Sequence, residues 1–429
     1  MKTYLKNSII YQIFPRNFTK KGNFKGVESK LSYLSDLGVN IIQTTPINLI
    51  GKVGRKGTLG SPYAIQDYYQ INPEYGDLND LKHLINAIHK SGMKFVIDIV
   101  FNHTSRDSVL LSTHPEWFYK DNNGNFSNKV GNWSDVFDLD YNQPGLIDYL
   151  LEVLDYYLSL GIDGFRFDVA SLIKKEFFIK LQQTLLVKYP NTILIAESVH
   201  QSFITYVRSL GFNALSDSEL IECGFDLLYE YNNRECLENY LKTKDNYYLG
   251  QYKYGLRYEE NANPKETLRI RGLENHDMPR IYNLTHNKNI MDNLLAYSFF
   301  LKGPSFIYMG EETKQKNKIE LFDKYLVNWH FDKKWFALLK TLISIKKNPT
   351  NQQLLISDVD LTKNDYLVIK NIFQDKSNAF GIFNFKNTNK PVTSEFFIDG
   401  KYLDLISNKI IEIKNKKIFT KQPLILIKA

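Results

Sequence analysis

The sequence predicts a closed (β/α)8 barrel, a TIM barrel, with a short subdomain inserted after its third strand and an antiparallel β-sandwich at its C-terminus. Two observations lead to this fold class. From residue 8 to about 330, short apolar runs typical of β-strands alternate with segments of helical periodicity, as expected for β-α-β units around a parallel sheet. After about Thr350 the helical periodicity gives way to strands separated by turn residues.

Eight apolar runs are predicted as barrel strands. They occupy residues 9–14, 40–44, 94–100, 164–169, 192–196, 225–231, 267–273 and 304–309. Helices lie between them: apolar residues recur at the spacing of one buried helix face in 146–160, which Gly161 ends, and in 80–90, which closes at Gly92. Eight strand–helix pairs fit a closed barrel better than an open sheet.

The predicted barrel is longer than the usual barrel of about 250 residues, which points to an insertion. The excess lies in residues 104–142, which are rich in Asn, Gly and aromatic residues and lack a long helical period. A loop of that length inside a compact domain usually carries its own small fold or a function. We therefore expect an inserted subdomain B at 104–142 and a catalytic barrel formed by residues 1–103 and 143–349.

Residues 350–429 are predicted to form the C-terminal β-sandwich. The expected strands are 354–356, 366–373, 379–385, 395–398 and 410–427. Turn residues separate them, such as the Asn-Thr-Asn run at 387–389 and Asp399-Gly400.

Composition excludes several classes of protein. Apolar residues make up 43% and charged residues 24% of the chain, which is ordinary globular usage and argues against a disordered or fibrous protein. The net charge of +7 comes from scattered lysines with no block of like charge, so we expect no nucleic-acid partner. Cys223 and Cys236 have no metal-like spacing and are expected to be reduced thiols.

A membrane partner and export are not expected either. No stretch approaches the roughly 20 apolar residues that a bilayer crossing needs. The apolar run near the start is interrupted by Gln12 and Arg16, and no small-residue cleavage site follows it, so it does not read as a signal peptide. We therefore expect a cytoplasmic protein.

Three carboxylates follow three of the predicted barrel strands: Asp168, Glu197 and Asp277. Reacting groups of barrel enzymes come from the C-terminal ends of different strands. Because strand side chains alternate, Arg166 should lie beside Asp168 and keep it ionised, as a nucleophile requires. Two opposed carboxyl groups, one ionised and one protonated, are the minimum for cleaving a glycosidic bond.

Glu197 and Asp277 have different predicted parts. Glu197 follows an apolar run, where desolvation would raise its pKa and keep a proton available for a leaving oxygen. Asp277, preceded by Asn275 and His276, could bind sugar hydroxyls and stabilise the positive charge of the transition state.

Each residue also has a structural interpretation. A single Asp beside an Arg is more often part of a structural ion pair than of a catalytic site. His103 and His276 taken singly are more often hydrogen-bonded residues, and with His200 they form no HExxH pattern, so a zinc site is not expected. Asp98, inside an apolar strand, is interpreted as structural.

Four segments together favour the catalytic interpretation. DIVFNH at 98–103, GFRFD at 164–168, AE at 196–197 and ENHD at 274–277 resemble, in order and spacing, the four signature regions of the α-amylase superfamily, glycoside hydrolase family 13. Supporting matches are GSPYAIQDY at 60–68, VFDLD at 136–140 and GPSFIYMGEE at 303–312. The resemblance covers residues 8 to 330. The C-terminal sheet resembles the family only in its general pattern of strands and turns.

The resemblance implies a retaining, double-displacement mechanism. It implies Asp168 as nucleophile, Glu197 as general acid and base, and Asp277 as transition-state stabiliser. It also implies substrate-binding residues that surround the sugar to be cleaved: Tyr63 stacks under the ring, and His103, Arg166 and His276 hydrogen-bond to it. An aromatic ring suits the apolar C–H face of a pyranose.

A bound metal is not expected. Asn102 and Asp138 match positions that bind calcium in many α-amylases, but two candidates fall short of the six to eight oxygen ligands that calcium takes. The run Ala170-Ser171-Leu172 also departs from the Lys-His that many α-amylases carry after the nucleophile. We expect no cofactor, since carboxylates alone can perform this chemistry.

The expected function is retaining hydrolysis of α-1,4 and/or α-1,6 glucosidic bonds in malto- or isomaltooligosaccharides. Val169 resembles members that cleave α-1,6 bonds, and the short insert favours short oligosaccharides over starch. Two alternatives remain open: an α-glucanotransferase that uses the same site, and a catalytically silent sugar-binding relative. The sequence specifies neither linkage and chain-length preference nor oligomeric state.

Overall fold

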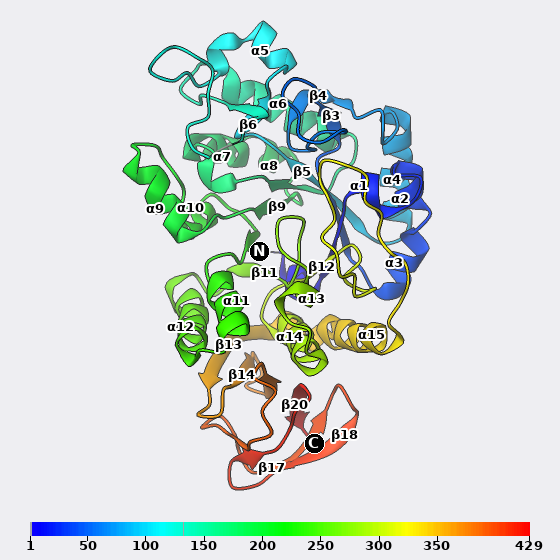
Figure 1. Cartoon of the computed structure of the whole chain (residues 1–429), viewed down its shortest axis with the longest axis vertical. Helices are drawn as coiled ribbons and strands as arrows, with labels where there is room; N and C mark the ends of the chain where they lie inside the picture. Colours follow the sequence, from blue (N-terminus) through cyan, green and yellow to red (C-terminus); the bar gives the residue numbers. More distant parts are fainter. Residues whose placement is uncertain (1, 132) are drawn as a thin grey trace. The chain divides into compact units, whose positions relative to one another are not determined.

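The structure is a computed structural model that describes residues 2–131 and 133–429 (Figure 1). Eight strands close into a barrel in the order β1-β12-β11-β10-β9-β8-β5-β2. Their bounds are β1 Ile9–Ile13, β2 Ile41–Thr44, β5 Lys94–Ile99, β8 Gly164–Phe167, β9 Ile193–Ala196, β10 Leu227–Tyr229, β11 Leu268–Gly272 and β12 Ser305–Tyr308. Each lies inside a run predicted from the sequence, and the predicted barrel fold is confirmed.

The barrel strands are buried along nearly their whole length, which explains their continuous apolar runs. Neighbouring strands pair in parallel, with Ile97 of β5 opposite Phe165 of β8. Gly164 begins β8 opposite Ile193 of β9, where an added Cβ would lie 2.3 Å from the Ile193 carbonyl oxygen. Only glycine permits this close approach of the two strands.

The chain divides into two compact units, and the first comprises residues 11–229 with 319–327. Its main helices, which lie between the barrel strands in sequence, are α1 Pro15–Phe18, α2 Phe24–Glu28, α3 Leu31–Leu37, α4 Leu78–Lys90, α6 Leu146–Ser159, α7 Lys175–Gln183, α8 Leu185–Lys188, α9 Gln201–Ser209 and α10 Asp217–Glu222. Both helices predicted from periodicity, α4 and α6, are present. Helix α4 begins in a capping box in which Asp77 accepts from the Asp80 backbone, satisfying an N–H group that the first turn leaves free.

Short paired strands accompany the insert in this unit. Strand β6 His103–Ser105 pairs antiparallel with β7 Val136–Asp138, and helix α5 Val109–Thr113 lies between them in sequence. Strands β3 Asn48–Ile50 and β4 Ile65–Ile71 form a second small ladder. The boundaries 104–142 of subdomain B stay a prediction.

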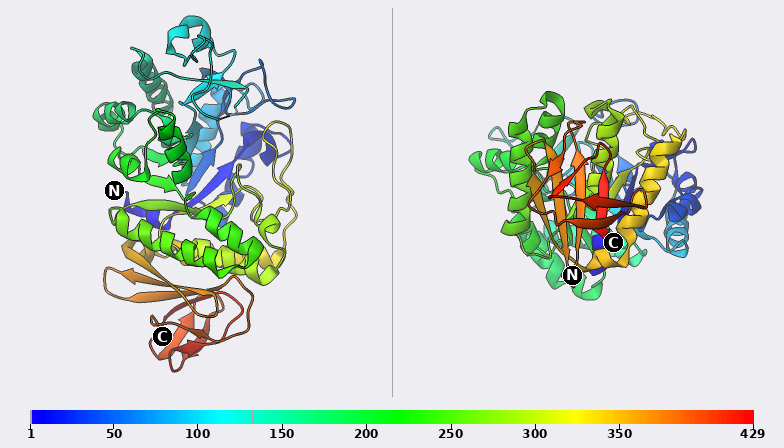
Figure 2. Two further views of the ribbon diagram at one scale, coloured as in Figure 1. Left: turned by 60° about the vertical axis from the view of Figure 1, so that its left-hand side comes forward. Right: turned by 90° about the horizontal axis from the view of Figure 1, so that it is seen from below.

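The second unit comprises the segment that ends at Ile10 and residues 230–318 and 328–429. Its helices are α11 Arg234–Thr243, α12 Asn246–Ala262, α13 Ile281–Leu284, α14 Lys288–Phe300 and α15 Lys333–Lys347. Its C-terminal strands form a six-stranded sheet in the order β13-β14-β15-β20-β17-β18, which Figure 2 shows side by side, and a two-stranded sheet β16-β19. Side chains of both sheets share one apolar core that includes Tyr366, Phe380, Val392 and Ile418.

The C-terminal strands are β13 Leu354–Leu361, β14 Tyr366–Phe373, β15 Asn378–Asn384, β16 Val392–Thr393, β17 Gly400–Asp404, β18 Lys409–Ile413, β19 Lys417–Ile418 and β20 Leu424–Lys428. The prediction of an antiparallel C-terminal sheet is confirmed, but two of its strands were wrong. Residues 395–398 form a turn, because Ser394 accepts hydrogen bonds from the backbone of Phe396 and Phe397. The run 410–427 is broken where Asn415 and Lys416 adopt positive φ.

No helix in the described ranges combines the length and the apolar character that a bilayer crossing requires.

Candidate active site

Arg166 lies at the centre of a cluster of carboxylates in the first unit. Its side chain projects from β8 and is fully buried. One terminal nitrogen, Nη1, donates to Asp98 Oδ1 at 2.8 Å and to Asp168 Oδ1 at 2.9 Å. The other, Nη2, lies 2.9 Å from Glu197 Oε2. One guanidinium therefore contacts three acidic side chains that come from three consecutive strands of the barrel.

The charge of Arg166 is held by these neighbours. Burial alone would lower its pKa, but the negative charges of Asp98 and Glu197 outweigh burial and raise the pKa well above its usual value. The guanidinium also lies over the rings of Tyr63 and Tyr229, with its carbon 5.9 and 5.3 Å from the ring centres. A buried cation fixed on several sides is a rigid support for the carboxylates that it contacts.

Asp168 follows the last residue of β8, and its neighbour Val169 has an unusual backbone. The Asp168 N–H continues the sheet by donating to the Ile99 carbonyl at 2.9 Å, and its side chain is mostly buried. Val169 then adopts φ 38°, a region that β-branched residues rarely enter. This turn directs the Val169 N–H to Glu197 Oε2, 2.7 Å away. The chain thus stores strain at the residue that joins Asp168 to Glu197.

Glu197 follows β9, and its surroundings differ from those predicted. The apolar run at 193–196 suggested apolar contacts for its carboxyl group, whereas the structure gives it the Arg166 guanidinium and the Val169 N–H. The contact between Glu197 and the Val169 N–H could not be predicted from the sequence. It depends on the positive φ of Val169, and a valine in the sequence does not indicate that conformation.

Tyr63 and His103 complete the arrangement in this unit. The Tyr63 hydroxyl donates to Asp98 Oδ2 at 2.8 Å, so both Tyr63 and Arg166 hold the Asp98 side chain. His103 Nε2 lies 4.0 Å from Asp168 Oδ2. Burial lowers the pKa of His103, which favours the neutral ring. Because the Asn102 amide nitrogen donates to Nδ1, the ring proton of the neutral form lies on Nε2, toward Asp168.

His276 and Asp277 belong to the second unit, on the loop that follows β11. His276 is buried, and its Nε2 lies 3.0 Å from Asp277 Oδ2, while the Asp277 side chain is 51% exposed. Asn275 Oδ1 accepts the N–H groups of Asp277 and Met278, which shapes this turn. The Asp277 carboxylate thus contacts His276 and is half exposed.

The same loop has an anchor that sequence reasoning did not single out. Glu274 is buried and binds the Arg280 guanidinium at 2.6 Å and the Ile281 N–H at 2.6 Å. Arg280 also donates to the Met309 carbonyl and lies over the Tyr308 ring, 4.4 Å from its centre. The ENHD segment therefore combines a buried structural acid, Glu274, with a half-exposed acid, Asp277.

Within residues 2–131 and 133–429, no group of three or more His, Cys, Asp and Glu side chains could hold a metal ion. The two calcium-site candidates, Asn102 and Asp138, contact each other through the Asn102 amide nitrogen, at 3.3 Å from Asp138 Oδ1. A nitrogen donor there does not serve calcium, which takes oxygen ligands.

Known proteins share both the sequence pattern and the fold. The family model for the α-amylase catalytic domain matches residues 12–124 and 112–379, and the model for the bacterial α-amylase C-terminal domain matches 359–426. The chain belongs to the α-amylase family. It is therefore a glycoside hydrolase of the α-amylase type, and the family resemblance predicted from the four segments is confirmed.

Individual relatives support this assignment. The crystal structure of an α-amylase from Lactobacillus plantarum is 36% identical over all of both chains, with a TM-score of 0.93. A cyclomaltodextrinase from a Bacillus species is 25% identical over 80% of this chain. An intracellular maltogenic amylase from Bacillus subtilis is 24% identical over 98% of this chain. The chain spans 66% of the length of the cyclomaltodextrinase and 74% of that of the maltogenic amylase.

Proposed function

We propose that this α-amylase family member hydrolyses α-glucosidic bonds of short malto- or isomaltooligosaccharides with retention, and that Asp168, Glu197 and Asp277 perform the chemistry. The observation that carries the proposal is the shared guanidinium: Arg166 contacts both Asp168 and Glu197. Retaining hydrolysis requires two neighbouring carboxyl groups, one to attack and one to transfer protons.

In the proposed reaction Asp168 attacks the anomeric carbon as the bond to the leaving sugar breaks. Glu197 gives its proton to the leaving oxygen, and a glucosyl ester on Asp168 results. Glu197 then takes a proton from water, whose oxygen replaces Asp168 at the anomeric carbon. The rigid contact of Arg166 with Asp168 and Glu197 supports these roles, because it fixes both groups before substrate arrives.

The other predicted residues act on the sugar. We propose that Asp277 stabilises the positive charge of the transition state, which its exposed carboxylate and its position after a barrel strand favour. Tyr63, His103, Arg166 and His276 are proposed to bind the sugar. In both His103 and His276, the Nε2 atom faces a candidate catalytic carboxylate.

The names of relatives suggest substrates and location. A cyclomaltodextrinase and a maltogenic amylase favour malto-oligosaccharides as substrates, and the second relative, named intracellular, favours a cytoplasmic location for this chain. The experiment below distinguishes cleavage of α-1,4 bonds from cleavage of α-1,6 bonds.

Proton NMR of maltotriose, isomaltose and panose digests tests the proposal. We expect the α-anomer to appear first, because a retaining enzyme that acts on an α-bond releases the α-anomer. The β-anomer should form later, by mutarotation. The same spectra report which bond is cut, and longer oligomers at high maltotriose would indicate glucanotransfer. First release of the β-anomer would contradict the double displacement.

Single substitutions test the roles of the two carboxylates. Asp168→Asn and Glu197→Gln should each lower kcat/KM by about 10³-fold or more while the folded state persists in circular dichroism. Asp155→Asn is the matched control, since Asp155 pairs with Lys188 on an exposed helix face and should leave turnover unchanged. Wild-type turnover by Asp168→Asn would remove Asp168 from the nucleophile role.

A further inference from the structure

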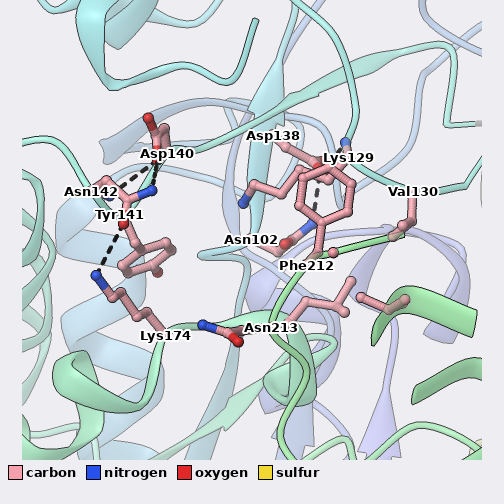
Figure 3. Close-up of a pocket in the computed structure, with 13 residues that line it drawn as sticks. Asn102, Lys129, Val130, Asp138, Asp140, Tyr141, Asn142, Lys174, Phe212 and Asn213 are labelled. Atoms are coloured by element: carbon pink, nitrogen blue, oxygen red, sulfur yellow. Dashed lines mark hydrogen bonds between the residues drawn. The ribbon is translucent and has the colours of Figure 1, made fainter. Parts of the chain in front are cut away.

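A hollow of about 170 Å³ lies in the first unit beside the end of β5 and the strand pair β6–β7. Figure 3 shows Asn102, Lys129 and Asp138 together on one side of it, and Asp140, Asn142 and Lys174 on another. Asn102 and Asp138 are the two residues whose counterparts in many α-amylases bind calcium. The hollow therefore lies at the position that corresponds to the calcium site of those enzymes.

A lysine side chain enters the site. Lys129 Nζ donates to the Leu139 carbonyl at 2.6 Å, and the Lys129 backbone N–H donates to Asp138 Oδ2 at 2.8 Å. Burial lowers the pKa of Lys129, and the negative charges of Asp138 and Asp140 oppose this shift. The Lys129 side chain is thus bonded to a carbonyl oxygen and lies in the field of two carboxylates.

N–H groups of the chain occupy the Asp138 oxygens that a metal ion would need. Asp138 is fully buried, and its Oδ1 accepts from the amide nitrogens of Asn102 and Asn128 at 3.3 and 3.2 Å. Both Asp138 oxygens are therefore bonded to N–H groups. A calcium ion needs six to eight oxygen ligands at about 2.4 Å, and these nitrogen donors take the lone pairs it would use. The residues present do not fit calcium.

This cluster is connected to the candidate catalytic residues. The Asn102 amide nitrogen, which donates to Asp138, also donates to His103 Nδ1 at 3.1 Å. His103 pairs with Asp138 across β6 and β7, and its Nε2 faces Asp168 at 4.0 Å. The contacts thus run from the Lys129 ammonium group to the Leu139 carbonyl, from the Leu139 N–H to the Asn102 carbonyl at 2.9 Å, and from the Asn102 side chain to His103, whose Nε2 faces the proposed nucleophile.

We propose that the Lys129 ammonium group takes the place of the calcium ion in this chain and holds Leu139, directly after β7, beside Asn102 near the end of β5, so that the enzyme needs no calcium. Lys129 is then a positioning residue: its side chain acts on His103 and Asp168 through Leu139 and Asn102. Its effect on turnover rests on the proposed role of Asp168, whereas its effect on metal binding does not.

The wild-type enzyme gives the first test. Removal of divalent metal with EGTA, or addition of millimolar calcium, should leave the melting temperature unchanged. Neither treatment should change kcat/KM by more than about twofold. Calorimetric titration with calcium chloride should show no binding at that concentration. Loss of activity in EGTA with recovery on adding calcium would overturn the proposal, and this result does not depend on any variant folding.

Lys129 variants give the second test. Lys129→Met retains the aliphatic stem and removes the charge, and we expect kcat/KM to fall about 10- to 100-fold, as for other residues that orient a catalytic group. Lys129→Arg should recover part of the loss, because it restores a cation. Lys174→Met is the matched control: Lys174 lines the same hollow but donates to Asn142, and its loss should leave kcat/KM unchanged.

Lys129→Ala gives a readout that a merely structural lysine would not. The variant vacates space beside Asp138 and the Asn102 Oδ1 atom, which is buried and accepts no hydrogen bond in the described structure. With the cation gone, millimolar calcium should bind in calorimetry and raise the melting temperature of Lys129→Ala but not of the wild type. Calcium binding by both proteins, or an unchanged kcat/KM in Lys129→Met, would contradict the replacement.

Discussion

At the scale of single residues, Arg166 determines how the candidate site is assembled. Its planar group reaches Asp98, Asp168 and Glu197 at once, because Nη1 and Nη2 point to different strands. A lysine has one compact charged nitrogen and cannot span these positions. Strand alternation predicted the contact between Arg166 and Asp168, and the contact with Glu197 required the folded barrel.

Arg166→Lys should therefore separate charge from geometry. We expect kcat/KM to fall about 10²-fold, because Asp168 and Glu197 lose their common support while one positive charge remains. Stopped assays on maltotriose and chemical unfolding measure both effects. The matched control is Arg271→Lys, another buried arginine with two carboxylate partners, Glu230 and Glu259. It should lose stability but retain turnover, and equal losses of turnover in both variants would contradict a specific role for Arg166.

At the scale of elements, the barrel strands could be predicted and the C-terminal strands only in part. A strand buried on both faces is a continuous apolar run, so β5 and β9 are visible in the sequence without ambiguity. In the C-terminal sheet, β17 carries Lys401 and β18 carries Lys409 and Glu412 on exposed positions, which weakens the apolar signal. Pairing with β20 then decides that β17 is a strand.

The turn between β8 and the short helix η3, Ala170–Leu172, is an element whose strain can be measured. Val169 has φ 38° there, a conformation that glycine adopts freely and L side chains do not. The Val169 side chain packs against an apolar cluster that includes Val207 of α9. Substitution by Ala or Gly removes nearly the same packing, but only Gly relieves the backbone.

Val169→Gly should consequently be more stable than Val169→Ala, by about 1 kcal/mol in the free energy of unfolding. In ordinary helix and strand positions the order is the opposite, and the Gly variant is less stable than the Ala variant. Urea unfolding of both variants measures the difference. Val207 provides the control in the same cluster, because its helical backbone should make Val207→Ala more stable than Val207→Gly by a similar amount. The same order at both positions would mean that Val169 stores no strain.

At the scale of the whole molecule, local patterns predicted the barrel and the identities of the candidate residues, and long-range contacts supplied the rest. Asp168 and Arg166 are two residues apart, so alternation alone relates them. Lys129 reaches Leu139, and Asn102 reaches Asp138 across 36 positions. Whether such partners meet depends on how the insert folds back on β6. The sequence contains no spacing pattern that predicts how the insert folds back. Asn102 and Asp138 could therefore be recognised as candidate calcium ligands, but the presence of Lys129 beside them could not be predicted.

Global stability should also depend on a buried lysine far from the candidate carboxylates in sequence. Lys346 of α15 is almost fully buried, and its Nζ donates to the Leu301 carbonyl at 2.6 Å. Burial, and secondarily the charge of Arg271, lower its pKa from 10.5 to about 7. Removing an ammonium group from water is costly when its hydrogen-bond acceptor is a neutral carbonyl.

The free energy of unfolding should therefore rise with pH above 7. Between pH 7 and 10.5 the unfolded chain binds a proton at Lys346 that the folded chain has released, so Lys346 contributes a slope of up to about 1.4 kcal/mol per pH unit. Lys346→Met lacks this slope: its stability advantage over wild type should be largest at or below pH 7 and shrink as pH rises. Urea unfolding at pH 7, 8 and 9 measures the difference. Exposed Lys347→Met is the control, with a difference from wild type that does not change with pH. A constant difference for Lys346→Met as well would mean that the folded protein keeps Lys346 charged throughout this range.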